Sequence, residues 1–149
     1  MASQRVRVRT AGEADADAVA DLSTQLGYPT TGPEVAGRLR LLLSSPEQAV
    51  LVAEDSDGAV VGWLHACVHH FIGGEPYAEI AGLVVHERHR GGGIGRLLMT
   101  EAERWAARRG LKTVNVRSRV ERALAHRFYE DLGYGRVKQQ QVFRKTLQD

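Results

Sequence analysis

The segment from residue 82 to residue 98 constrains the fold of this chain more than any other. An apolar run ends at Val85, a basic turn follows, and a stretch with four glycines, residues 91–95, leads into apolar residues with helical spacing. The first N–H groups of a helix have no partner inside the helix, and the helix dipole adds positive potential there. Glycine lets the main chain approach an anion closely because it has no Cβ. The segment is therefore typical of a strand, a phosphate-binding turn and a helix.

Two common nucleotide-binding motifs do not fit this turn. A nucleoside-triphosphate loop ends in Gly-Lys followed by Ser or Thr, whereas Arg96 and Leu97 follow Gly95. The dinucleotide motif Gly-x-Gly-x-x-Gly needs a last glycine at position 96 or 98, and Arg96 and Leu98 stand there. Three arginines lie in or beside the turn, at positions 88, 90 and 96, which a loop that only needs flexibility would not require. The pattern favours a different phosphate-bearing ligand.

Length and composition are those of one globular domain. The chain has 149 residues, of which 43% are hydrophobic and 26% charged, so we expect a single domain over residues 1–149. The formal net charge of +2 is too small to indicate a nucleic-acid partner, and no apolar run approaches the length needed to cross a membrane. The chain has one cysteine, Cys67, which excludes an internal disulfide. We expect a cytoplasmic protein that binds neither nucleic acid nor membrane.

Hydrophobic periodicity predicts seven strands and four helices. The strands are expected at residues 4–9, 49–54, 60–71, 77–85, 112–117, 134–138 and 141–147. Three helices are expected to start at capping boxes, at residues 10–13, 31–34 and 118–121, and the fourth starts at the glycine turn. The last two strands have no obvious tight turn between them. The order βααβββαβαββ indicates an α/β or α+β fold, with a mixed, mostly antiparallel seven-stranded sheet flanked by four helices.

Three motifs recur together in one known family. They are Gly-Leu-Val-Val at 82–85, Arg90-x-x-Gly93-x-Gly95, and Ala-His-Arg-Phe-Tyr-Glu-x-x-Gly-Tyr at 125–134. With this order of elements they resemble the GNAT superfamily of acyl-CoA-dependent N-acetyltransferases, over essentially the whole chain. The resemblance implies that strands 77–85 and 112–117 splay apart at one end. It also implies that acetyl-CoA, the co-substrate, lays its pantetheine arm between them and bonds to the first strand like an added strand.

The same resemblance assigns binding residues. Backbone groups of Leu83, Val84 and Val85 would contact the thioester and the pantetheine arm. The residues expected around the pyrophosphate are Arg90, Gly91, Gly92, Gly93, Ile94, Gly95 and Arg96. The family often has Lys or Arg directly after the first glycine of the loop, where this chain has Gly92, so one phosphate contact is missing or comes from Arg88. Tyr28 and Pro29, between the first two helices, would frame the pocket for the acceptor amine.

Acetyl transfer from a thioester to an amine requires a base and benefits from an acid. An ammonium group with a pKa of about 10.4 becomes a nucleophile only after it loses a proton. Tyr129 matches the family's general acid, which protonates the departing thiolate; the alternative is an apolar-core aromatic beside Phe128. Glu79 is the first candidate for the base, with an exposed carboxylate at a strand edge as the alternative. A histidine or a chain of water molecules could also serve.

Strand periodicity bears on the base and on a metal site. Strict alternation would put Glu79 on one face with Leu83 and Val85, unless a bulge in the strand changes the parity. His65, Cys67 and His69 alternate along another strand. Strand residues four positions apart are about 13 Å from one another, so the two histidines cannot share an ion and no metal site is expected. A single histidine such as His65 could still relay protons.

The favoured interpretation is an acetyl-CoA-dependent N-acetyltransferase that acts by direct attack of a primary amine of a small molecule or peptide. The alternative is an acyl-CoA-binding sensor or scaffold domain without turnover. Nucleic-acid binding through the arginines of the helix after the glycine turn is disfavoured, because acidic residues interleave with them and aromatic stacking platforms are lacking. A homodimer is common in families of this kind, although no apolar stripe in the sequence specifies one. The acceptor is left open.

Overall fold

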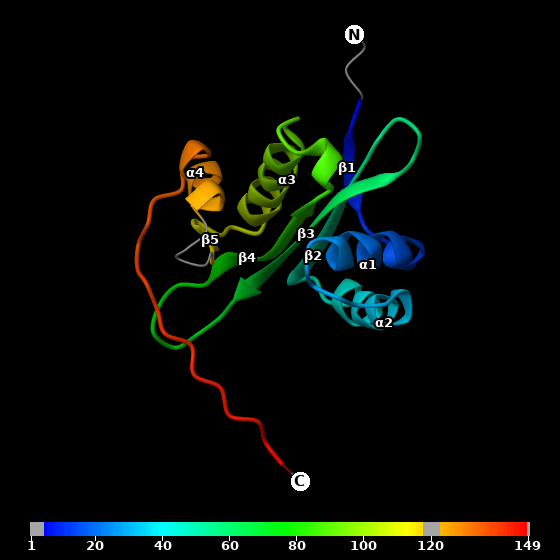
Figure 1. Ribbon diagram of the computed structural model, residues 1–149. Coiled ribbons are helices and arrows are strands. Elements are labelled where there is room, and N and C mark those ends of the chain that lie inside the picture. Colours follow the sequence, from blue (N-terminus) through cyan, green and yellow to red (C-terminus); the bar gives the residue numbers. More distant parts are fainter. Residues whose placement is uncertain (1–4, 118–122, 149) are drawn as a thin grey trace. The chain divides into compact units, whose positions relative to one another are not determined.

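The computed structural model describes residues 5–117 and 123–148, which belong to two compact units that meet at Arg117 and Ser118 in the sequence (Figure 1). The first unit contains β1 (Arg7–Thr10), the short 3-10 helix η1 (Glu13–Asp15), α1 (Ala16–Gln25), α2 (Gly32–Leu43), β2 (Gln48–Glu54), β3 (Val60–His69), β4 (Tyr77–Val85), the 3-10 helix η2 (Glu87–His89), α3 (Ile94–Arg108) and β5 (Val114–Val116). The second contains α4 (Ala123–Asp131).

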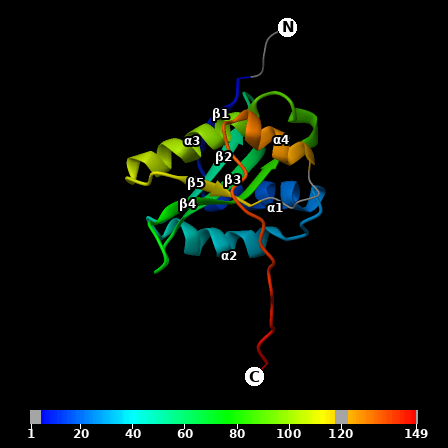
Figure 2. The ribbon, with the colours of Figure 1, turned by 90° about the vertical axis from the view of Figure 1, so that its left-hand side faces the viewer.

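The five strands form one sheet in the order β1-β2-β3-β4-β5. The first four strands are antiparallel to their neighbours, and β5 is parallel to β4. Helices α1 and α2 cover one face of this sheet and α3 covers the other, as Figures 1 and 2 show from two directions. The expected mixed, mostly antiparallel sheet and the four helices are confirmed for the part of the chain that the structure describes.

The expectation of seven strands is wrong, because the sheet of the described residues has five. Residues 132–148, where two strands were expected, are neither helix nor strand. The link between the two expected strands is Gln139-Gln140, which lacks the residues that form tight hairpin turns. The large apolar side chains of this segment are exposed: Val137, Val142, Phe143 and Leu147. A hairpin that buries no apolar face is at best marginally stable in water, so alternation alone does not produce strands here.

Two apolar layers fix the helices to the sheet. Between the sheet and helices α1 and α2 lies an apolar cluster, against which Trp63 packs. Its members are Ala11, Ala16, Val19, Ala20, Val35, Leu39, Val50 and Val52. On the other face of the sheet, the side chains of Leu64 in β3 and of Leu98 and Met99 in α3 are fully buried. Gly62 lets α3 come close to the sheet, because a Cβ there would stand 3.3 Å from side-chain carbons of both Ile94 and Leu98. This contact anchors the start of α3 beside the end of β4.

The start of the first helix differs from the expected capping box at residues 10–13. Thr10 ends β1, and the N–H of Gly12 donates to the Asp15 carboxylate at 2.8 Å. Asp15 itself is buried, with 8% of the residue exposed. Burial is tolerated because the Arg9 guanidinium donates to both Asp15 oxygens at 2.9 Å and to Glu54 at 2.9 Å. This network joins β1, β2 and η1.

The other helix signals were read correctly where the structure describes them. Thr31 caps α2 by accepting a hydrogen bond from the N–H of Glu34 at 3.3 Å. The third expected capping box lies outside the described residues. Gly27, Gly110 and Gly133, which follow α1, α3 and α4, have φ values of 89°, 76° and 96°. In this left-handed region glycine is favoured, and each of the three helices ends just before such a glycine.

Removing the Asp15 carboxylate should destabilise the first unit. In Asp15→Ala, Arg9 loses one of its two carboxylate partners and the Gly12 N–H loses its acceptor, so we expect unfolding to cost about 2 kcal/mol less at neutral pH. The Arg9 hydrogen bonds lower the pKa of Asp15 from its ordinary 3.8. The stabilisation is therefore complete above that value and is lost as pH falls through the lower folded-state pKa. Urea unfolding at neutral and strongly acidic pH measures it.

A matched control for this prediction is Asp21→Ala, which removes an exposed carboxylate from α1, the helix that directly follows η1. It should change stability by less than about 0.5 kcal/mol. An equal loss in both variants, or a loss in Asp15→Ala that does not shrink in acid, would contradict a role for the Arg9–Asp15 pair.

Candidate active site

The strand, glycine turn and helix expected at residues 82–98 are all present. β4 ends at Val85, η2 follows, and α3 begins at Ile94. Gly91 and Gly93 have φ values of +81° and +87°, which only glycine adopts without strain. The three glycines before α3 are exposed, whereas Ile94 is buried against the sheet. The first N–H groups of α3 therefore lie next to an exposed turn whose last three residues before the helix are glycines.

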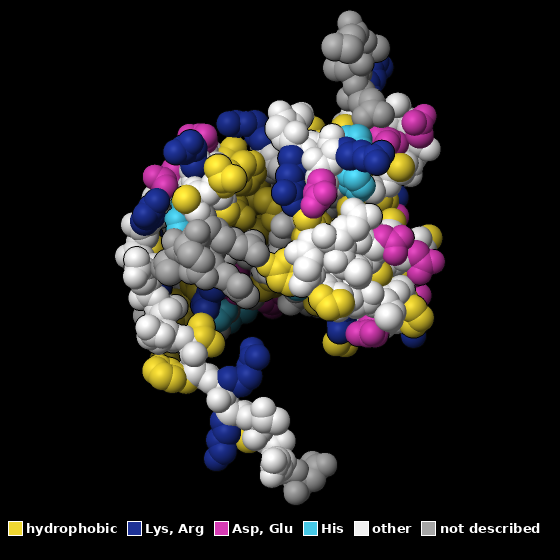
Figure 3. All heavy atoms as spheres, in the orientation of Figure 1, with side chains coloured by type: hydrophobic (Ala, Val, Ile, Leu, Met, Phe, Trp, Pro, Cys, Tyr) yellow, Lys and Arg dark blue, Asp and Glu magenta, His cyan; other side chains and the backbone are white. Residues whose placement is uncertain are grey.

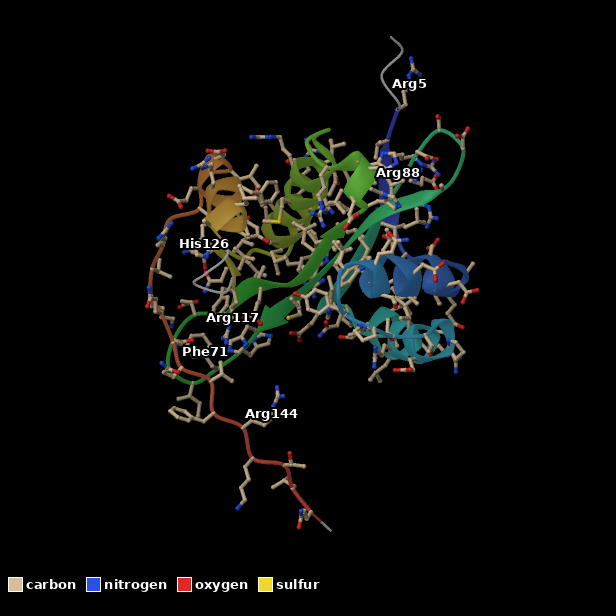
Figure 4. All side chains as sticks on the ribbon, in the orientation of Figure 1. Arg5, Phe71, Arg88, Arg117, His126 and Arg144 are labelled. Atoms are coloured by element: carbon tan, nitrogen blue, oxygen red, sulfur yellow. The ribbon has the colours of Figure 1, made fainter. Side chains whose placement is uncertain are left out.

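Basic side chains surround this turn. Arg88, Arg90 and Arg96 are all exposed. Figure 3 shows Lys, Arg and His side chains gathered over η2, and Figure 4 places Arg88 there. His86 holds this turn in place, since its Nδ1 accepts a hydrogen bond from the N–H of Arg88 at 3.1 Å. An exposed helix start with nearby guanidinium groups is suited to an anion such as a phosphate.

The edge of β4 next to the glycine turn has no partner strand among the residues that the structure describes. β4 pairs with β5 over three residues only, and the last pair is Ile80 with Val116. Beyond Ile80, the strand continues to Val85 with β3 on one side and no strand of the described residues on the other. Leu83, Val84 and Val85 lie in this stretch. Main-chain groups along such an edge can bind an extended ligand as if it were a further strand.

A β-bulge at Ala81 divides β4 into two parts. His65 of β3 pairs with Gly82 and the next residue, Ala66, pairs with Ile80, which leaves Ala81 as an extra, exposed residue. The extra residue reverses the alternation of side chains. Glu79 therefore lies on the face toward α1 and α2, whereas Leu83 and Val85 lie on the face toward α3. The expectation that these three share a face is wrong for this reason.

The face of the sheet toward α1 and α2 carries polar side chains near this bulge. We call it the polar face; its members are Gln48, His65, Cys67, Tyr77, Glu79 and Arg117. Glu79 accepts a hydrogen bond from Arg117 Nε at 2.8 Å, and the Glu79 side chain is 18% exposed. Glu79 is thus an ion-paired, half-buried carboxylate. The carboxylate and a hydrogen bond with Tyr77 raise the pKa of Arg117.

Aromatic rings border the polar face at the β3–β4 turn. The rings of His69 and Tyr77 stack with centroids 5.0 Å apart, and Phe71 packs against both at 5.3 and 5.7 Å. Figure 4 shows Phe71 and Arg117 at this end of β4. These three rings limit the space that is available to a ligand next to the Glu79–Arg117 ion pair.

His65 and Cys67 occupy the centre of the polar face. His65 Nε2 lies 2.7 Å from Gln48 Oε1, and burial lowers the pKa of His65 below its ordinary 6.5. Burial and the nearby Glu79 raise the pKa of the Cys67 thiol. The sequence alone did not identify Gln48 and Arg117 as residues of this site. Strand register brings Gln48 of β2 to His65 and brings Arg117, at the end of β5, to Glu79. No motif marks them.

The remaining expected site residues lie elsewhere. Tyr28 and Pro29 are exposed in the loop between α1 and α2, with 47% of Tyr28 accessible. Tyr129 lies in α4, where its ring packs edge-on against Phe128 at 5.1 Å and Tyr134 at 6.2 Å. Because α4 belongs to the second unit, a place for Tyr129 beside the thioester stays a prediction of the resemblance.

Residues 5–117 and 123–148 contain neither a candidate metal site nor a helix suited to span a membrane. No group of three or more His, Cys, Asp or Glu side chains in these ranges could hold a metal ion. None of the helices in the same ranges is both long and apolar enough to cross a membrane.

Comparisons with known proteins agree on one family. The acetyltransferase (GNAT) family model matches residues 17–134, whereas no curated protein matches the sequence significantly. Aminoglycoside N-acetyltransferase AAC(6')-Iy in complex with CoA has a TM-score of 0.87, with 17% identity over 98% of each chain. Aminoglycoside 6'-N-acetyltransferase AAC(6')-Ih from Acinetobacter baumannii has a TM-score of 0.83, with 18% identity over 96% of this chain and 99% of that chain. A GNAT family acetyltransferase from Staphylococcus aureus has a TM-score of 0.74, with 21% identity over 95% and 98%. At these identities the structural likeness shows the fold.

Proposed function

The chain belongs to the GNAT acetyltransferase family, and from this premise we propose that it is an acetyl-CoA-dependent N-acetyltransferase for a primary amine of a small molecule or peptide. One observation carries the proposal: the open glycine turn at the start of α3 lies directly beside the partnerless edge of β4. The first feature suits a pyrophosphate and the second an extended pantetheine arm. Acetyl-CoA contains both groups.

The binding roles follow from this placement. Main-chain N–H groups of residues 91–96 would hold the pyrophosphate, with Arg90 and Arg96 adding charge. Gly92 offers no side chain, and Arg88 is a nearby arginine that could supply the missing contact. Leu83, Val84 and Val85 would bond to the pantetheine arm through their main chain. A main-chain N–H of Val84 or Val85 would stabilise the negative oxygen of the tetrahedral intermediate.

Two side chains complete the proposed chemistry. Glu79 lies below the bulge of β4 on the polar face and is our candidate for the carboxylate that holds the protonated amine where it loses its proton. The neutral amine attacks the thioester carbonyl carbon, the attacking nitrogen loses its second proton to solvent, and the C–S bond breaks. Tyr129 gives its phenolic proton to the CoA thiolate and regains one from solvent. The products are the N-acetylated amine and CoA, with one proton released to solvent.

The acceptor is best approached through a panel of amines. Two of the similar structures are aminoglycoside N-acetyltransferases, so aminoglycosides belong in the panel beside polyamines, amino acids and peptides. The protein should release free thiol from acetyl-CoA with at least one class, and mass spectrometry should find that amine heavier by one acetyl group. Calorimetry with CoA provides an independent measure of binding. Binding without turnover across the whole panel would support a sensor or scaffold, and absence of CoA binding would overturn both.

A further inference from the structure

The polar face carries a second titratable side chain next to the bulge, His65, which the proposed roles do not use. We propose that His65 takes up the proton that leaves the acceptor amine and passes it to solvent. The inference rests on the proposed function and names a further residue of the same site. Four observations support it: the position of His65 in the sheet, its hydrogen bond, the charges around it, and the ion pair of Glu79.

The position of His65 coincides with the start of the partnerless edge of β4. His65 pairs with Gly82, directly after the bulged Ala81, and the last residue that β4 pairs with β5 is Ile80. Gly82 carries no side chain, and the ring of Trp63 covers it closely, since a Cβ there would stand 2.8 Å from that ring. No side chain of β4 therefore faces the imidazole at this level, and His65 remains partly exposed. An acceptor on the polar face can approach it.

The hydrogen bond with Gln48 sets the orientation of the imidazole. His65 Nε2 lies 2.7 Å from the Gln48 side-chain oxygen, and an amide oxygen can only accept. With this assignment Nε2 carries the hydrogen, and Nδ1 presents its lone pair. A base that is fixed in one tautomer in this way is ready to accept a proton at a defined atom.

The surroundings keep His65 neutral at neutral pH. Burial lowers the pKa of His65, and its closest polar partner, Gln48 on β2, is uncharged. The titratable or charged groups on the same face are Cys67 and His69 on β3, Tyr77 and Glu79 on β4 and Arg117 at the end of β5. The layer of α1 and α2 that faces the sheet is apolar. The proton-accepting form therefore predominates when the enzyme would work.

The ion pair of Glu79 gives the two residues different tasks. One Glu79 oxygen already accepts from Arg117, so the carboxylate is suited to attract and hold a cationic amine. An imidazole, with an ordinary pKa near neutrality, picks up and releases a proton in this range more readily than a carboxylate does. The ammonium N–H bond breaks, an N–H bond forms at His65 Nδ1 directly or through one water molecule, and the imidazolium then returns the proton to solvent.

The test is the pH dependence of turnover in His65→Gln, with an active amine from the panel. We expect kcat to fall about tenfold, and the acidic limb of the kcat/KM profile to disappear, while CoA binding by calorimetry and the melting temperature stay unchanged. An acceptor whose ammonium pKa is near neutral should lose less activity than one with an alkaline pKa. His70→Gln is the matched control, because His70 is an exposed histidine directly after the end of the same strand.

A second variant tests the role of His65 if His65→Gln folds poorly. Gln48→Glu places a carboxylate next to the imidazole, which favours imidazolium, so the acidic limb should move to higher pH. An unchanged acidic limb in a folded His65→Gln or in Gln48→Glu overturns the role of His65 and leaves the proposed function intact, because turnover persists. A wild-type protein that binds CoA and turns over none of the amines overturns both.

Discussion

Replacing Tyr129 by phenylalanine is expected to lower kcat about 100-fold and to leave the affinity for CoA within about twofold. The change removes one oxygen and keeps the ring that packs against Phe128 and Tyr134, so α4 should retain its structure. The departing thiolate then takes its proton from water instead of from a positioned phenol. The alkaline limb of the kcat profile, which reports deprotonation of that phenol, should disappear as well. Thiol release under saturating substrates and calorimetry with CoA measure the two quantities.

The neighbouring tyrosine provides the control for this expectation. Tyr134→Phe removes the same atom from a ring 6.2 Å away that no motif assigns to catalysis. Its kcat should stay within about twofold of the wild-type value, as is usual for a substitution without a catalytic role. Equal losses in both variants would indicate that the aromatic cluster acts through packing, and full activity in Tyr129→Phe would remove Tyr129 from the mechanism.

Local signals in the sequence predicted most of the elements correctly because their causes are local. The glycines that end three helices and the Thr31 cap act within a few residues of themselves, and strand 77–85 was placed with both ends correct. The glycine turn belongs to this group too, since a positive φ at Gly91 and Gly93 follows from the residue type. Most of the expected cofactor-binding residues lie in this turn and at the end of β4 for the same reason.

The errors have long-range causes. The bulge at Ala81 results from the register between β3 and β4. No residue near Ala81 predicts from the sequence that Glu79 and Leu83 lie on opposite faces of the sheet. The burial of Asp15 depends on Arg9 and Glu54 in two other elements. The hydrogen bond between the side chains of His65 and Gln48 likewise depends on the β2–β3 register, which pairs Gln48 with Cys67 and His65 with Val50. Conversely, alternation at residues 134–147 predicted strands that the described structure lacks, because a strand also needs a partner and a buried face.

The glycine turn yields the second large expectation. In Gly93→Val, a β-branched residue must adopt a φ near +87° directly before α3, and we expect affinity for CoA to fall about 30-fold. The substituted turn either stores this strain or moves the first N–H groups of α3 away from the pyrophosphate. A Cβ at this position meets no protein atom within 4 Å, so the added side chain enters open space, where the proposed pyrophosphate would lie. Calorimetry with CoA measures the affinity.

Gly58→Val separates strain from ligand contact. Gly58 has a φ of +82° and equally open surroundings, but it lies in the turn between β2 and β3. Both variants should lose a similar amount of stability in urea, because a β-branched residue is strained to a similar degree at both positions. Only Gly93→Val should lose CoA affinity. If the two variants bind CoA equally well, bare main-chain donors at the start of α3 do not hold the pyrophosphate, and the phosphate contacts must then come from the arginine side chains around the turn.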